Sequence, residues 1–428
     1  MTHFGIVCPA ATGHLNTLLP IGQKLKERGH KVTVINFLDA QARVVAANLD
    51  FSPIGVRDFP LGSMEDPLAE MGKTDGLTSL RHAIALFGKK AAAIMEDTPQ
   101  IIKTTGIDML LIDQTSRGAD GVAEYLQIPF VSICSAVVLN ADSSIPPVFM
   151  PWHYRPPSLL GNMRNWMGYQ LLYYISKPIS RVLSSYRKQW GLPLHPNPND
   201  DYSSLAQISQ QPKEFEFPRT DLPPYFHFTG PYHTEEHREE VEFPWEKLSS
   251  DKPLVYASLG TIQNKAESTF HIIADACKNL DIQLVLSLGG SGDNTMFPSL
   301  PGNPIVVNYA PQLELLKRAT LMITHAGLNS TLEALTNGVP LVAIPITSDQ
   351  PGVAARIAWT GVGEVVHIFR LTAPRLTDAI KKVLENKSYK EKALKMQESI
   401  KKSGGVDLAV KIIEQVAATG KPVLPNQV

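Results

Sequence analysis

The sequence has few of the features that mark membrane-spanning, secreted or nucleic-acid-binding proteins. Its 3 cysteines, Cys8, Cys134 and Cys277, lie far apart without zinc-binding or redox spacing, which suits a reducing compartment. No apolar run approaches the length of a membrane span, and the N-terminus lacks the basic stretch of a signal peptide. The formal net charge of −1 gives no overall field that would attract nucleic acid. We therefore expect a cytoplasmic protein, monomeric, with no nucleic-acid partner.

The chain also lacks a dinucleotide-binding fingerprint, although its pattern is α/β. Apolar strands and amphipathic helices alternate at close spacing from residue 4 to about 133, and again from residue 254 onward. This alternation predicts two open parallel sheets covered by helices on both faces. Neither half has Gly-x-Gly-x-x-Gly after its first strand, which counts against NAD binding.

Composition suggests where the two halves meet. Residues 140–224 are rich in proline, tryptophan and tyrosine, so we interpret them as long loops around one or two helices inserted in the first domain. Residues 231–252 carry many charges and two prolines without periodicity, as in a linker. We predict an N-terminal domain at 1–230, a linker at 231–252 and a C-terminal domain at 253–403. The last helix, within 404–428, is expected to pack back on the N-terminal domain.

The most informative stretch is 308–350. It predicts a strand at 321–324, a small polar turn at 325–330, a helix at 331–337 and a second strand at 341–344. Backbone N–H groups are unsatisfied at the start of a helix and its dipole is positive there, so this turn is a ready anion site. An ordinary turn with asparagine or serine as the helix N-cap is the plainer interpretation.

Other polar residues are predicted to gather on the same edge of the second sheet. Tyr309 and Gln312 precede the turn, Glu333 lies on its helix, and Asp349 and Gln350 follow the next strand. Open α/β sheets bind their ligands at this carboxyl edge. An aromatic ring, amides, anion donors and carboxylates together suit a nucleotide sugar.

In spacing and residue type, this stretch closely resembles the donor-binding signature of the family 1 UDP-glycosyltransferases, which are inverting enzymes with the GT-B fold. More than ten positions match in fixed order, and the likeness extends to both ends of the chain. The matching residues are Tyr309-Ala310-Pro311-Gln312, His325-x-Gly327-x-Asn329-Ser330, Glu333, Gly338-Val339-Pro340, Pro345 and Asp349-Gln350, with Thr12-Gly13-His14, Pro20, 108–113 and Ser258-Leu259-Gly260-Thr261 elsewhere.

The resemblance implies a role for each matching donor residue. The ring of Tyr309, where plant members have tryptophan, would stack on uracil, and the backbone of Ala310 would bond its edge. The ribose hydroxyls would be held by Gln312 and Glu333, and the sugar hydroxyls by Asp349 and Gln350. The diphosphate would lie against the turn, with Gly13 and Thr261 also at the donor; the turn residues are His325, Gly327, Asn329 and Ser330. Ala326 and Leu328 depart from the cysteine and tryptophan of the plant pattern, and Val353 stands where plant members often have asparagine.

Two residues of the first half are candidates for catalysis. His14 begins a predicted helix and Asp113 ends a predicted strand, and either is more often a cap or surface residue. Both follow the carboxyl ends of parallel strands, so they share one rim of the first domain. A histidine oriented by a buried carboxylate is a general base near neutral pH. The resemblance assigns His14 as the base that takes the acceptor proton, with Asp113 supporting it.

The resemblance also implies what the reaction needs. UDP-glucose or a related nucleotide sugar is the expected donor, and a small apolar molecule with a hydroxyl group is the expected acceptor. We expect no metal and no cofactor, because the turn at 325–330 can stabilise the leaving diphosphate and the chain has no Asp-x-Asp metal signature. A GT-B-like UDP-sugar epimerase and a non-catalytic nucleotide-sugar-binding protein are the alternatives.

The sequence does not distinguish between several classes of acceptor. A phenolic or flavonoid, a carotenoid alcohol, a sterol and a macrolide all fit an apolar pocket. The aromatic stretch at 145–174 has three interpretations: helix packing, acceptor pocket, or a face in weak contact with a membrane surface.

Overall fold

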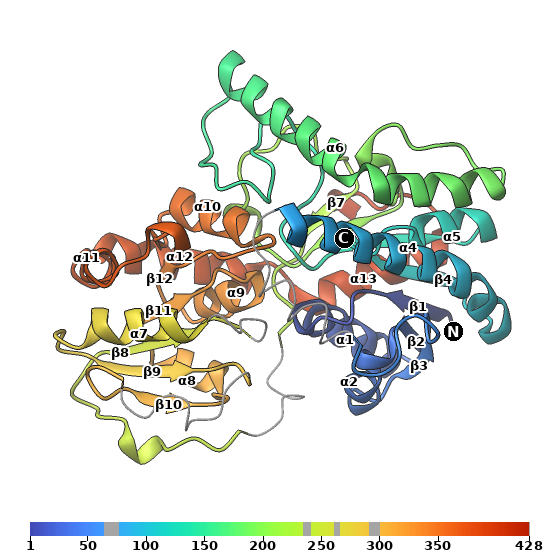
Figure 1. The fold of residues 1–428 in the computed structure, drawn as a ribbon. Helices are drawn as coiled ribbons and strands as arrows, with labels where there is room; N and C mark the ends of the chain where they lie inside the picture. Colours follow the sequence, from blue (N-terminus) through green and yellow to red (C-terminus); the bar gives the residue numbers. More distant parts are fainter. Residues whose placement is uncertain (64–76, 234–240, 261–265, 291–299, 428) are drawn as a thin grey trace.

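The protein consists of two parallel β-sheets, each covered by helices (Figure 1). The computed structural model describes residues 1–63, 77–233, 241–260, 266–290 and 300–427. Thr261, one of the predicted donor residues, lies outside the described residues. The predicted architecture of two doubly wound parallel sheets is confirmed.

The N-terminal sheet has seven strands in the order β3-β2-β1-β4-β5-β6-β7, and every pairing is parallel. Its strands are β1 His3–Val7, β2 Lys31–Asn36, β3 Asp50–Pro53, β4 Met109–Asp113, β5 Phe130–Cys134, β6 Gln207–Ser209 and β7 Phe226–Phe228. Its helices in this half of the chain are α1 Thr12–Glu27, α2 Gln41–Ala46, α4 Leu77–Thr105, α5 Ala119–Leu126 and α6 Leu159–Gln189.

The C-terminal sheet has six parallel strands in the order β10-β9-β8-β11-β12-β13. The strands are β8 Leu254–Ser258, β9 Gln283–Ser287, β10 Ile305–Val307, β11 Leu321–Thr324, β12 Leu341–Ala343 and β13 Gly363–Val365. The helices are α7 Ala266–Cys277, α8 Gln312–Arg318, α9 Leu328–Thr336, α10 Gln350–Thr360, α11 Ala373–Glu385, α12 Lys387–Lys402 and α13 Gly405–Thr419.

Both faces of each sheet are buried, which explains why the strands read as apolar runs without polar alternation. Within β8, Val255 and Ala257 belong to one hydrophobic core, whereas Tyr256 belongs to the core on the other face. In β1, Ile6 and Val7 likewise enter different cores. Side chains alternate between the faces of a strand, so a sheet covered on both sides needs apolar residues at every position.

Some elements differ from their prediction. The strands β6 and β13 were not expected, because each is only three residues long and neither stands in a continuous apolar run. The aromatic region holds one long helix, α6, which agrees with the prediction of one or two helices. The helix after the polar turn begins at Leu328, so Asn329 and Ser330 lie in its first turn and Gly327 is its N-cap, without a side-chain cap.

The two halves are joined by more than the linker. The last helix, α13, packs on α1, and its Ala409 and Ile413 enter the core of the N-terminal sheet. A buried ion pair links the loop after β6 to α10: Arg356 Nη2 lies 2.6 Å from Glu216 Oε1, with both side chains inaccessible to water. Breaking such a pair leaves a buried charge, so the pair favours one arrangement of the two sheets.

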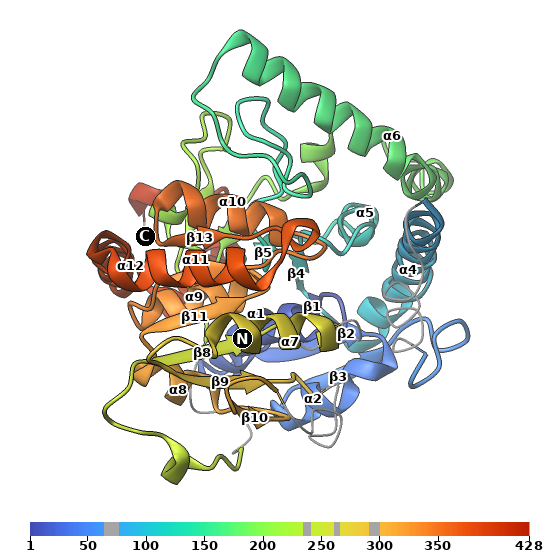
Figure 2. The ribbon, with the colours of Figure 1, turned by 60° about the vertical axis from the view of Figure 1, so that its left-hand side comes forward.

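The start of α6 projects from the body of the protein in both views (Figures 1 and 2). Its later part packs along α4. In the described part of the chain, no helix is long and apolar enough to cross a membrane.

Candidate active site

His14 and Asp113 meet at the carboxyl edge of the N-terminal sheet. His14 stands in the first turn of α1, which follows β1, and Asp113 is the last residue of the neighbouring strand β4. His14 Nδ1 lies 2.9 Å from Asp113 Oδ2 and 2.7 Å from Ser135 Oγ. This contact leaves Nε2 as the ring nitrogen that can accept a proton, and the side chain is 24% exposed.

The carboxylate of Asp113 is buried, and both of its oxygens accept hydrogen bonds. Ser135 donates its hydroxyl to Oδ2, and Thr115 donates both its backbone N–H and its hydroxyl to Oδ1. Burial alone would raise the pKa of Asp113, but His14 and these donors outweigh it and lower the pKa. For His14 the effects have the opposite sign. Burial lowers its pKa, but the Asp113 carboxylate raises it by more, so the pKa lies above its ordinary value. Asp113 therefore stays ionised and makes His14 a stronger base.

Two helix N-termini meet where the domains touch. The first turn of α9 lies against the first turn of α1, with Asn329 Nδ2 donating to the carbonyl of Gly13 at 2.8 Å. Neither helix has a side-chain cap. Gln210 joins them from a third side, because its Nε2 lies 2.8 Å from Asn329 Oδ1 and within hydrogen-bonding distance of Thr17 Oγ1 and the Ser135 carbonyl. Two positive helix ends at one point suit a diphosphate.

The ring of His325 lies between two glycines. A Cβ atom at Gly260 or Gly327 would come within 3 Å of it, so both positions need glycine. Burial lowers the pKa of His325 to about 4, and the ring is therefore neutral near pH 7. It can offer a diphosphate a hydrogen bond but no charge. The next residue, Ala326, has φ +65°, a strained conformation of the kind that collects at functional turns.

The residues predicted to hold the ribose are in contact with one another. Gln312 begins α8, and its side-chain amide donates to the Glu333 carboxylate and lies 3.3 Å from Ser330 Oγ. Tyr256, from β8, donates its hydroxyl to Gln312 Oε1 at 3.0 Å. Tyr309 precedes α8 and is half exposed. Its ring lies so close to Gly290 that a Cβ atom there would clash with it.

Asp349 connects the two halves electrostatically. It is the N-cap residue of α10, and burial raises its pKa. The charges of Asp349 and His14 act on each other, which places the predicted sugar end of the donor near the predicted base. The neighbouring Gln350 uses its side-chain oxygen to accept from the backbone N–H groups of Ile346 and Thr347. The part of Gln350 that can reach a sugar is therefore its amide nitrogen.

Three residues of the site were not predicted from the sequence: Ser135, Gln210 and Tyr256. Ser135 follows β5 at the same edge as Asp113, so its place after an apolar strand was an available signal. Gln210 follows β6, the strand that was not expected. Tyr256 lies within an apolar strand and carries no polar pattern. Among the described residues, the structure joins His14 to Asp113, Gly13 to Asn329, and Gln312 to Ser330 and Glu333.

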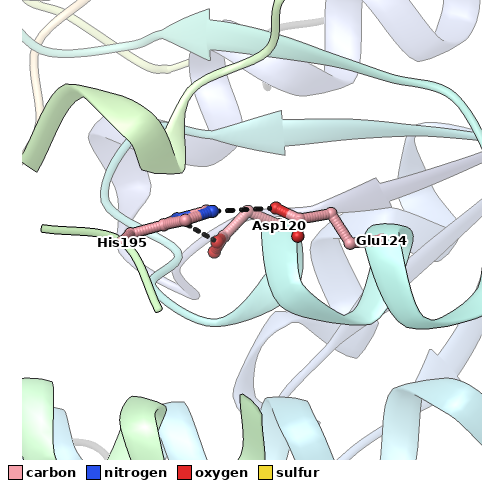
Figure 3. Close-up of side chains that lie close together, drawn as sticks. All are labelled: Asp120, Glu124 and His195. Atoms are coloured by element: carbon pink, nitrogen blue, oxygen red, sulfur yellow. Dashed lines mark ion pairs between the residues drawn. The ribbon is translucent and has the colours of Figure 1, made fainter. Parts of the chain in front are cut away.

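A second titratable cluster lies apart from this site, on the other side of β4. Asp120 and Glu124 of α5 stand beside His195, with ligand atoms within 4.8 Å of one another (Figure 3). This spacing could hold a metal ion, but Arg187 Nη2 already lies 2.6 Å from Glu124 Oε2 and 2.8 Å from His195 Nε2. Arg187 and the protonated His195 ring supply the positive charge, so we interpret the cluster as an ion-pair network that joins the end of α6 to α5.

Comparison with known proteins identifies the family. The sequence profile described as UDP-glucoronosyl and UDP-glucosyl transferase matches residues 6–419. A zeaxanthin glucosyltransferase of Pantoea ananas is 32% identical over 426 residues, which cover 99% of this chain and 98% of that protein. A zeaxanthin glucosyltransferase of Pseudescherichia vulneris is 28% identical over 426 residues, covering 99% and 100%.

Solved structures agree in fold. The glycosyltransferase of kitacinnamycin superposes with a TM-score of 0.76 over 96% of this chain and 98% of that one, at 22% identity. The calicheamicin glycosyltransferase CalG4 also gives 0.76, over 99% and 100%, at 20% identity. The chain therefore belongs to the UDP-glucoronosyl and UDP-glucosyl transferase family and is a glycosyltransferase with the GT-B fold.

Proposed function

We propose that this glycosyltransferase moves glucose from UDP-glucose to a hydroxyl group of an apolar alcohol, with inversion at the anomeric carbon. The observation that carries the proposal is the pair formed by His14 and Asp113 at the point where α9 touches α1. The predicted base, supported by a buried carboxylate, stands on one domain, and all the predicted donor residues except Gly13 stand on the other. A hydroxyl group held between them is the group that the base would activate.

In the proposed reaction, Nε2 of His14 takes the proton of the acceptor hydroxyl. The acceptor oxygen then forms a bond to the anomeric carbon of glucose as the bond from that carbon to the UDP oxygen breaks, and UDP leaves. The Asp113 carboxylate stabilises the imidazolium that forms, and its contact at 2.9 Å fixes the ring orientation. One displacement from the opposite side inverts the configuration.

The leaving diphosphate gains negative charge, which the chain can stabilise without a metal. The first turn of α9 would supply backbone N–H groups and the side chains of Asn329 and Ser330. Asn329 now donates to the Gly13 carbonyl, so a bound diphosphate would take over that donor and loosen the contact between the two helices. Donor binding and domain contact would then be linked.

For the acceptor, we propose a carotenoid alcohol. Two relatives that align over nearly their whole length are named zeaxanthin glucosyltransferases, and zeaxanthin is a long apolar molecule with a hydroxyl group at each end. A relative that is 26% identical is named 4'-demethylrebeccamycin synthase, so other apolar acceptors belong in the same test.

Release of UDP from UDP-glucose tests the proposal. We expect release, and a new glucoside, when zeaxanthin dispersed in detergent is added to the protein. Phenols, a flavonoid and a sterol serve as comparison acceptors. If UDP-glucose binds but no acceptor causes release, the transferase proposal fails and a non-catalytic binding role takes its place. Conversion of UDP-glucose to another UDP-sugar without an acceptor would instead indicate an epimerase.

The same reaction tests the proposal that no metal takes part. We expect the rate of UDP release to be unchanged in EDTA, because the helix N-terminus and polar side chains stabilise the diphosphate. The measurement compares initial rates with EDTA, without it, and with added Mg²⁺ or Mn²⁺. A loss of activity in EDTA that either ion restores would contradict the proposal.

A further inference from the structure

The start of α6 carries its apolar side chains on the outside of the protein. Leu159 is 86% exposed, Leu160 73% and Tyr174 68%, and the side chains of Met163, Trp166 and Met167 are more than half exposed. At 3.6 residues per turn, these six lie on one side of the helix, which we call the outer face of α6. Figures 1 and 2 both show this part of the helix standing away from the two sheets, with the loop that precedes it alongside.

The side of the helix that faces the protein is small and polar instead. Its buried residues in the first turns are Gly161, Asn165 and Gly168. Asn165 donates to the carbonyl of Ser143 at 3.0 Å, and a Cβ atom at Gly168 would come within 2.8 Å of the Trp152 ring. A surface helix of a globular protein has the reverse arrangement, with its apolar side inward. The outer face therefore has no packing role within the chain, and apolar patches of this kind mark interaction sites.

The charged side chains of α6 and of the stretch that flanks it in sequence are of one sign. No aspartate or glutamate occurs from residue 143 to residue 199, a stretch that holds six arginines and lysines in a chain of net charge −1. Lys177, Arg181 and Lys188 continue the line of the outer face after Tyr174, and all three are exposed. Within the described residues, no ion pair involves any of these three. The helix therefore presents an apolar half followed by a basic half along one side.

An apolar helix face with neighbouring basic side chains is the pattern of helices that lie in a membrane interface. Aromatic and aliphatic side chains enter the boundary between headgroups and acyl chains, and lysine or arginine binds the anionic headgroups. A second copy of this chain fits less well, because two such faces would bring their basic halves near each other or leave them uncovered.

We propose that the outer face of α6, with Lys177 and Arg181, docks the protein on the surface of an anionic lipid bilayer. The inference rests on the proposed function in one respect: a long apolar alcohol partitions into bilayers, so docking would bring the acceptor-binding domain to its substrate. The helix belongs to the domain that carries His14, because its later part packs along α4.

Sedimentation with lipid vesicles tests the proposal. The full chain is mixed with vesicles of phosphatidylcholine alone, or of phosphatidylcholine and phosphatidylglycerol in equal parts. We expect binding to the anionic vesicles, release at high salt and little binding to the neutral ones. The double variant Leu160→Glu with Met167→Glu should bind at least tenfold more weakly, because it places carboxylates in the apolar face. Lys177→Gln with Arg181→Gln should weaken binding to anionic vesicles specifically.

A matched control replaces two exposed apolar residues elsewhere, Val45→Glu with Phe369→Glu, and should bind as the wild type does. All four proteins are first compared by thermal unfolding, since every substituted side chain is exposed and the fold should be kept. Absence of wild-type binding to anionic vesicles, or equal binding by the first double variant, overturns the proposal. The proposal is also overturned if the wild type is a dimer, the Leu160→Glu and Met167→Glu variant is a monomer, and neither binds vesicles.

The outcome is separable from that of the proposed function. Vesicle binding needs no turnover, and UDP release with a water-soluble phenol needs no membrane. If the wild-type protein releases UDP but does not bind anionic vesicles, only the docking proposal is wrong. Vesicle binding without UDP release from any acceptor removes the proposed function alone.

Discussion

At the residue scale, the site depends on a hydrogen-bonded group of three side chains. His14 Nδ1 lies 2.9 Å from Asp113 Oδ2 and 2.7 Å from Ser135 Oγ, and the same serine donates to that carboxylate. The pairing of His14 with Asp113 was predictable because both follow neighbouring parallel strands, and strand ends meet at one edge. Ser135 also follows a strand at this edge, but a serine after a strand is common, so that signal alone did not select it.

The electrostatics of this pair predict the pH dependence of transfer. Asp113 raises the pKa of His14 above its ordinary value of 6.5, and only the neutral ring can accept a proton. The value of kcat/KM should therefore fall as pH drops through a pKa that lies above 6.5. In Asp113→Asn the carboxylate charge is absent, so the acidic limb should move to lower pH and kcat should fall by about 10²-fold or more. A pH–rate profile of both proteins checks this, and an unmoved limb would contradict the role of Asp113.

At the scale of elements, the polar turn was predicted in type but not in extent. Starting α9 at Leu328 turns Asn329 and Ser330 into helix residues, because Gly327 provides the extended N-cap that asparagine or serine would otherwise supply. The short strands β6 and β13 escaped prediction, since three residues form a strand only when a neighbouring strand supplies their hydrogen bonds. Missing β6 also hid Gln210, the residue that follows it and joins Asn329 to α1.

The ion-pair network between α5 and α6 gives a prediction about stability. The carboxylates of Asp201 and Glu124 raise the pKa of His195 to about 9, against burial and the opposing charge of Arg187. The folded pKa exceeds the unfolded value of 6.5, so the stabilisation is complete below pH 6.5 and disappears as pH rises through about 9. The ring is partly exposed, so screening reduces its contribution to about 1–2 kcal/mol.

Urea unfolding at several pH values measures this contribution. His195→Gln should be less stable than the wild type by about 1–2 kcal/mol at pH 6.5, and the difference should shrink toward pH 10. His82→Gln changes an exposed histidine of α4 and should show no such difference. A gap between wild type and His195→Gln that stays constant from pH 6.5 to 10 would contradict a protonated His195.

At the scale of the whole molecule, the division into two α/β halves was predictable from the repeated alternation of strands and helices. How the halves meet was not. The hydrogen bond from Asn329 to Gly13 and the buried pair of Glu216 with Arg356 join residues more than a hundred positions apart. Such pairings depend on the relative position of the two sheets, which no local sequence pattern determines. The arrangement nevertheless places the predicted base from one half beside predicted donor residues from the other.

The variant His14→Ala tests most directly whether one half supplies the base while the other binds the donor. Calorimetric titration with UDP-glucose and the rate of UDP release are measured on the same preparation, with His82→Ala as the control. We expect His14→Ala to bind UDP-glucose as the wild type does, because all the predicted donor residues except Gly13 lie on the other domain, while kcat falls by about 10²–10⁴-fold. Turnover at the wild-type rate would contradict the proposed role of His14 as the base.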